Sequence, residues 1–198
     1  MIPEISSRRS IRQFTGEPVS REEILAVLEA GNRAPSAKNR QPWRFLVLTG
    51  KAKSEAVEAM RRGIERERQG NAMLPGSARH LAGAEYTARI MEQAPALVLV
   101  SNPLGNPPDR PLSPEERVYE LANLQSVGAC VENICLEAEA RGLGSLWICD
   151  IFFAYEELSR LAGMEGELAA AVALGHPAEH PASRPRRKLA DIVEWRED

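Results

Sequence analysis

The sequence predicts a mixed α+β fold in a single domain that spans residues 1–198. Apolar, β-rich runs and amphipathic helices interleave along the chain without the regular β–α–β period of a doubly wound sheet. Neither an internal repeat nor a linker divides the sequence. Its 198 residues, 43% of them hydrophobic and 27% charged, have the composition of one globular domain with a sizeable core.

The first half of the chain opens with a strong helix signal. Ser20 and Glu23 form a capping box, in which each side chain accepts from the other residue's free backbone N–H, ahead of an apolar face that ends near Gly31. Apolar runs and turn residues predict the elements that follow. In order they are a turn-rich segment over 34–42, a strand over 43–48, a helix over 51–69, a loop around 75–76 and a weaker helix over 78–91.

The second half is built around one long helix. Ser113, Pro114 and Glu116 predict its start, and Gly142 predicts its end after Arg141. Its apolar stripe predicts burial on more than one side, and Gly128 in its middle predicts close helix packing, within the chain or across a subunit boundary. The other expected elements are strands over 95–101, 145–149 and 168–174, a short helix over 154–163 and a five-proline loop over 102–114.

Composition and charge exclude several functional classes. The net charge of −3, from 25 basic and 28 acidic residues, argues against nucleic-acid binding, which needs a net basic surface. The three cysteines and three histidines show no metal-ligand or disulfide spacing, so no metal is expected. No apolar run could span a bilayer, and the N-terminus lacks a signal-peptide pattern. We therefore expect a cytoplasmic protein in which Cys130, Cys135 and Cys149 are small core residues.

Arginines cluster near both ends of this slightly acidic chain. The N-terminal cluster consists of Arg8, Arg9 and Arg12 around Ser10, and the C-terminal cluster of Arg184, Arg186, Arg187 and Lys188. Guanidinium groups bind phosphate through a planar fork of donors, and two or three of them make a phosphate pocket. The alternative interpretation is that both clusters are solvated chain ends, because terminal runs of charge are common.

The segment 35–43 is dense in side-chain amides and hydroxyls, which supply donors and acceptors for the edge of a polar heterocycle. A capped turn between a helix and a strand would explain the same residues. Gly142-Leu143-Gly144 is only G-x-G and does not make a dinucleotide fingerprint. No nucleophile, base and acid occur in a recognisable arrangement. A phosphate pocket without acid–base machinery is typical of a protein whose cofactor carries the chemistry.

Three stretches of the chain resemble the flavin-dependent nitroreductase family. Arg8-Arg9-Ser10-Ile11-Arg12-Gln13-Phe14 is similar to the family's R-R/H-S-x-R/K-x-F opening. Residues 35–43, P-S-A-K-N-R-Q-P-W, are similar to its P-S-x-x-N-x-Q-P-W signature, the most specific of the three. Residues 141–148 and then 184–188 are similar to its flavin-ring loop and phosphate-binding tail. The resemblance therefore covers nearly the whole chain.

This resemblance implies a largely antiparallel sheet flanked by helices, in an intertwined homodimer with two sites, each built from both subunits. The tail 184–198 would cross onto the partner subunit. Each site would bind one FMN, with NAD(P)H as the donor and a nitroaromatic, quinone or similar electron-poor acceptor. Hydride would enter and leave at flavin N5 in alternation, a ping-pong reaction, so no catalytic residue of the protein is expected.

The family's functional residues carry over onto matching positions of this sequence. Arg8, Ser10, Arg184 and Arg186 would hold the FMN phosphate, with Arg9 contributing by backbone or side chain. Arg12 would lie toward the N1–C2 carbonyl side of the ring, where a fixed cation stabilises the charge of reduced flavin.

Two further groups would lie at the flavin. Ser36 and Asn39 of the partner subunit would contact the isoalloxazine ring or the ribityl chain, with Pro35 and Gln41 near them. Trp147, Cys149 and Asp150 would present backbone groups to the N5–O4 edge. The family often has glycine where this chain has Cys149-Asp150, and a carboxylate facing N5 would disfavour electron-rich flavin. Segments 50–91 and 102–114 match no fixed motif and are expected to shape the substrate pocket.

Two other functions remain open from the sequence. The same fold and FMN could serve a specialised redox step, such as dehydrogenation of a heterocycle, dehalogenation or breakdown of the flavin itself. A non-enzymatic binding protein with basic ends is the more remote alternative.

Overall fold

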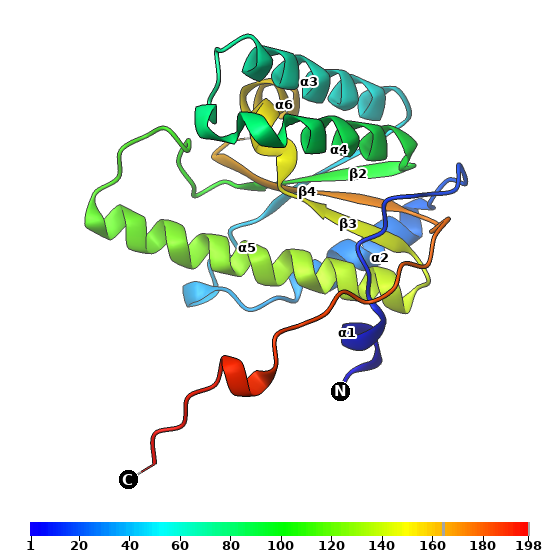
Figure 1. The fold of residues 1–198 in the computed structure, drawn as a ribbon, viewed down its shortest axis with the longest axis vertical. Helices are drawn as coiled ribbons and strands as arrows, with labels where there is room; N and C mark the ends of the chain where they lie inside the picture. The colour runs from blue at the N-terminus through cyan, green and yellow to red at the C-terminus, as the bar shows by residue number, and fades with distance from the viewer. Residues whose placement is uncertain (164, 198) are drawn as a thin grey trace.

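The computed structural model describes residues 1–163 and 165–197. A four-stranded sheet lies between two layers of helices (Figure 1). Its strands are β1 (Arg44–Thr49), β2 (Ala96–Asn102), β4 (Glu167–Gly175) and β3 (Gly144–Ile148), in that spatial order. Every neighbouring pair is antiparallel, which confirms the predicted α+β class with its helix-flanked antiparallel sheet.

Each face of the sheet has its own hydrophobic core, because side chains alternate along a strand. On β2, Leu97 and Leu99 pack into the core beneath α3 (Gly50–Arg68), α4 (Leu81–Gln93) and α6 (Tyr155–Ala162). Val98 and Val100 pack into the opposite core, beneath α2 (Arg21–Asn32) and α5 (Pro114–Ala140). All seven residues of β2 are buried, as the continuous apolar run predicts.

The predicted elements are present with boundaries shifted by a few residues. Both capping boxes form as expected, at Ser20 and Glu23 on α2 and at Ser113 and Glu116 on α5. The sequence does not predict five short elements, which have too few residues for a periodic pattern. They are α1 (Pro3–Ser7) and the 3-10 helices η1 (Ala37–Asn39), η2 (Pro75–His80), η3 (Asp150–Ala154) and η4 (Leu189–Asp191).

The long helix α5 is buried along only part of its apolar stripe. Val131 and Ala138 are buried beneath the sheet, but Leu121 and Leu124 remain 52% and 36% exposed. The prediction of burial on more than one side is therefore wrong for this half of the helix within one chain. Among the described residues Gly128 is also not closely packed, since an added Cβ would lie 3.6 Å from Cη2 of Trp147, an ordinary van der Waals contact.

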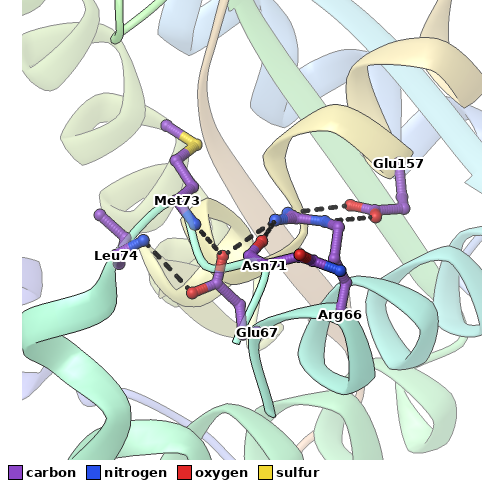
Figure 2. A network of polar contacts seen from close by, with 6 residues as sticks. All are labelled: Arg66, Glu67, Asn71, Met73, Leu74 and Glu157. Atoms are coloured by element: carbon purple, nitrogen blue, oxygen red, sulfur yellow. Dashed lines mark hydrogen bonds and ion pairs between the residues drawn. The ribbon is translucent and has the colours of Figure 1, made fainter. Parts of the chain in front are cut away.

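An ion-pair network fixes the segment between α3 and η2 (Figure 2). The buried carboxylate of Glu67 accepts from the backbone N–H groups of Met73, at 2.7 Å, and Leu74, at 3.2 Å. Arg66 donates to Glu157 on α6 at 2.8 Å and to the carbonyl of Asn71 at 2.7 Å. The network thus ties residues 71–74 to two helices of the same layer.

Within the two described ranges, no helix is long and apolar enough to cross a membrane.

Candidate functional site

The two ends of the chain meet in one pocket. Its volume is about 250 Å³, and it lies between the N-terminal segment and the segment that follows β4. The lining residues are Arg8, Arg9, Ser10, Arg12, Pro181, Ala182, Ser183, Arg184 and Arg186. Members of both arginine clusters, which are more than 160 residues apart in sequence, therefore face the same space.

Backbone pairing brings the two ends together. Ser10 forms a parallel bridge with Ser145 at the edge of the sheet, and Ile11 N–H donates to the carbonyl of Ser145 at 2.9 Å. Phe14 forms an antiparallel bridge with Pro177, so residues before 14 run beside residues after 177. The Glu179 carboxylate completes the join by accepting from the backbone N–H groups of Arg12 and Gln13.

Two glycines make room for the N-terminal segment against the sheet. Ile11 and Phe14 are both buried in the core. An added Cβ would lie 2.9 Å from Cγ2 of Ile11 at Gly144 and 2.7 Å from Cδ1 of Phe14 at Gly175. Side chains at these positions would push the N-terminal segment, and the arginines that it carries, away from the sheet. Sequence analysis assigned Gly144 only to a weak G-x-G pattern and missed this role.

The pocket carries an excess of positive charge. Arg8 is paired with Glu132, with 3.3 Å between Nε and Oε1. No other pocket arginine forms an ion pair within the part of the chain that the structure describes. Nε of Arg9 is buried without a hydrogen-bond partner, which is costly unless an acceptor is bound. An anion with several oxygen atoms, such as a phosphate monoester, fits this set of donors.

Arg9 also forms hydrogen bonds to the backbone next to the pocket. Its Nη1 donates to the carbonyls of Ser6, Ser7 and Arg8, at 2.7–2.9 Å, at the C-terminal end of α1. Its guanidinium is therefore held in place by the backbone before any ligand arrives. Arg187 and Lys188, the remaining members of the C-terminal cluster, are exposed and do not line the pocket.

The polar segment 35–43 lies elsewhere on the same chain. Ser36, Asn39 and Gln41 belong to a tight loop against α5, which we call the 36–41 loop, and Pro35 precedes it. Gln41 N–H donates to the Ser36 hydroxyl at 3.0 Å, and Gln41 Nε2 donates to Oδ1 of Asn39 at 3.2 Å. None of these residues lines the arginine pocket of its own chain. One chain therefore does not bring all the predicted ring contacts together.

The third predicted group sits where β3 ends. Trp147 is 39% exposed, and Cys149 is exposed, so the expectation that Cys149 is a core residue is wrong. The reason is its position between the sheet edge and η3. Partial burial of its thiol, and then the neighbouring charge of Asp150, raise its pKa. Cys130 and Cys135 are buried as expected, which raises their pKa to about 12 and about 11.

The Asp150 carboxylate has a protein partner. Its Oδ2 accepts from the hydroxyl of Thr87 on α4 at 2.5 Å. A second cavity of about 370 Å³ opens beside Cys149 and Asp150. Its other lining residues are Leu74, Ser77, Arg79, His80, Gly83, Phe152 and Phe153. The network in Figure 2 fixes Leu74 at its rim. Segment 50–91 thus contributes to a cavity next to the predicted flavin-ring residues, but no pattern in the sequence indicates which side chains do so.

Two carboxyl groups are buried together at the far end of the sheet. Glu167 begins β4 and lies close to the buried Glu120 of α5. Burial, and then Glu120, raise the pKa of Glu167 to about 8. Asn106 of the proline loop donates to Glu120 at 3.3 Å. The pair is separate from the arginine pocket and anchors the start of this loop.

The fold and the pocket together define an α+β protein whose paired chain ends form an arginine-rich site suited to an anion. The family model described as the nitroreductase family matches residues 5–176, and the chain belongs to this family.

Similar proteins cover nearly the whole chain. A nitroreductase-type protein from Desulfovibrio desulfuricans, solved in complex with FMN, is 31% identical, with a TM-score of 0.71, over 99% of this chain and 96% of that chain. The NADH dehydrogenase of Thermus thermophilus is 28% identical over 96% of this chain and 92% of its own length. The iodotyrosine deiodinase of Thermotoga neapolitana is 29% identical over 92% of this chain and 91% of its own length.

Proposed function

We propose that this chain is an FMN-dependent NAD(P)H oxidoreductase that acts on a nitroaromatic, quinone or similar electron-poor acceptor. The observation that carries the proposal is the convergence of Arg8, Arg184 and Arg186 on one pocket. Membership of the nitroreductase family, and a relative that binds FMN, support FMN as the ligand.

The arginine pocket suits the phosphate end of FMN. Arg8, Ser10, Arg184 and Arg186 would donate to the phosphate oxygens, and the buried Nε of Arg9 is a donor that lacks an acceptor. Arg9 is oriented by three backbone carbonyls, so it adds positive charge at little entropic cost. The pocket volume of about 250 Å³ accommodates the phosphate end and leaves the ring to lie outside it.

The ring would extend from this pocket toward Arg12 and the end of β3. When bound, FMN supplies the redox chemistry, taking hydride at N5 from NAD(P)H and passing it to the acceptor. Arg12 makes no ion pair in the described ranges and would place its charge near the N1–C2 carbonyl side of the ring. The Asp150 carboxylate is bonded to Thr87, which favours backbone contacts from residues 147–150.

A complete site would need a second copy of the chain. The 36–41 loop lies outside the arginine pocket of its own chain, and we propose that it reaches the ring of the partner's FMN. The exposed Leu121 and Leu124 of α5 would be buried between subunits. The tail also carries exposed apolar residues and extends away from the body of the molecule (Figure 1). We propose that residues 184–198 cross onto the partner, where Trp195 and its neighbours would be buried.

An absorbance spectrum of the purified protein tests the proposal. We expect a yellow protein whose flavin band is bleached by NADH or NADPH without oxygen. A matched pair of variants locates the cofactor: Arg186→Ala should weaken FMN binding, and Arg187→Ala, whose side chain lies outside the pocket, should not. A colourless protein that FMN cannot reconstitute would refute the proposal.

A specialised redox step on the same flavin is the second candidate. The similarity to the iodotyrosine deiodinase of Thermotoga neapolitana favours it, because that relative matches over nearly the whole chain. Bound flavin that neither NADH nor NADPH reduces, but another donor does, would indicate this function. A cytoplasmic location and the lack of nucleic-acid binding remain predictions.

A further inference from the structure

The 36–41 loop has an unusual backbone. Lys38, Asn39 and Gln41 have φ angles of 53°, 53° and 48°, in the left-handed region that residues other than glycine rarely adopt. Three such residues within four positions cost free energy, so the surrounding structure must compensate. Bonds within the loop provide part of this compensation, through Gln41 with Ser36 and Asn39.

The loop has two attachments to α5. The backbone N–H of Ala37 donates to the Ser126 hydroxyl at 3.3 Å. The ring of Tyr119 receives two cations: the Arg40 guanidinium carbon lies 4.3 Å from the ring centroid, and the Lys38 Nζ lies 5.6 Å from it. In the described ranges neither Lys38 nor Arg40 forms an ion pair with a carboxylate, and both cations lie over the Tyr119 ring instead.

The two residues that contact the Tyr119 ring, Lys38 and Arg40, lie directly before and after Asn39 in the sequence. Holding the residues on both sides restrains the backbone at Asn39, whose Oδ1 accepts from Gln41 Nε2 at 3.2 Å. The two cations repel each other, and the negative face of one aromatic ring offsets this repulsion. The backbone of Tyr119 lies in the second turn of α5, which begins with a complete capping box.

We infer that Tyr119 is a positioning residue for FMN binding: its ring clamps Lys38 and Arg40 and thereby presents Asn39 and Ser36 to the flavin. This inference rests on the proposed function, because it takes the 36–41 loop as part of a flavin site. In this role Tyr119 would act through the 36–41 loop and not by contact with the cofactor. It acts by keeping the left-handed loop in the binding conformation before FMN arrives, which lowers the cost of binding.

The test measures FMN affinity by fluorescence quenching in reconstituted protein. Tyr119→Leu removes the ring, and we expect FMN binding to weaken by about fivefold or more, the combined effect of two exposed cation–π contacts. Tyr119→Phe keeps the ring face and should retain affinity within about twofold. Rescue by Phe distinguishes the clamp from a role of the hydroxyl. Arg40→Gln combined with Tyr119→Leu should weaken binding by less than the product of the two single effects.

Two controls separate the possible failures. Tyr86→Leu removes a similar pair on α4, where Arg89 lies 5.6 Å from the ring centroid, and should leave FMN affinity unchanged. Arg186→Ala reports on the phosphate pocket. Weak binding in Arg186→Ala with wild-type affinity in Tyr119→Leu would overturn the clamp and leave the proposed function standing. Equal losses in Tyr119→Leu and Tyr119→Phe would also overturn the clamp. A wild-type protein that does not bind FMN would overturn both.

Discussion

Glu167→Gln should stabilise the protein by an amount that grows with pH. The Glu167 carboxyl is buried, faces Glu120, and has a pKa raised from 4.5 to about 8. Between these two values the folded protein keeps a proton that the unfolded chain has lost. The unfolded state binds fewer protons, so the free energy of unfolding falls as pH rises through this window.

The magnitude follows from the two pKa values. Each pH unit in the window removes about 1.4 kcal/mol, so linkage gives a loss of about 3 kcal/mol between pH 4.5 and pH 7, levelling off above pH 8. Glutamine resembles the protonated acid in shape and can donate from Nε2 to the Glu120 carboxylate. Glu167→Gln should therefore match the wild type near pH 4.5 and exceed its stability by about 3 kcal/mol at pH 7.

Urea unfolding from pH 5 to pH 9, at one saturating FMN concentration, measures this difference. Glu165→Gln is the matched control, because Glu165 is exposed and lies two residues before Glu167. We expect the control to follow the wild type at every pH. A stability difference between Glu167→Gln and wild type that stays constant with pH would show that Glu167 is not protonated in the folded protein, and would refute the reasoning.

Three further substitutions test the site and its support. Arg186→Ala should weaken FMN binding by about 1.5–3 kcal/mol, the range for a charge-assisted hydrogen bond, measured by titration of the apo-protein; unchanged affinity would contradict a phosphate contact. Arg12→Ala should lower the flavin reduction potential, measured against a reference dye, more than it lowers affinity; the opposite pattern would move Arg12 away from the ring. Gly144→Ala should destabilise the fold by about 1–3 kcal/mol, because its Cβ would lie 2.9 Å from Ile11, whereas Gly16→Ala meets no atom within 4 Å and should cost much less. Equal thermal stability of the two glycine variants would refute the packing argument.

The sequence predicts the regular elements well because their signals are local. The capping boxes at Ser20 and Ser113 are read from residues three apart, and both helices begin where these boxes indicate. The apolar run of β2 reflects burial on both faces of a central strand. Short elements such as α1 and η2 have too few residues to show a period, so only the folded chain reveals them.

Periodicity does not predict which part of the apolar stripe on α5 is exposed. Leu121 and Val131 belong to the same apolar stripe, yet only Val131 is buried within the chain. Periodicity reports that a surface is apolar, and it does not report whether the chain itself or another molecule covers that surface. The same limit applies to Trp195 in the tail.

The arginine pocket depends on pairing between residues that are far apart in sequence. Motif spacing identifies Arg8 and Arg186 as candidates. The bridges at Ser10 and Phe14 that bring them together are backbone contacts, which do not depend on the type of side chain. The sequence reflects these bridges through two glycines: Gly144 and Gly175 lack the side chains that would displace Ile11 and Phe14. Gly144 and Gly175 lie at the ends of β3 and β4, one residue outside the predicted strands 145–149 and 168–174, where glycine is also a common turn residue. Local sequence therefore does not show which segment approaches them, and the shared pocket depends on contacts that only the folded chain reveals.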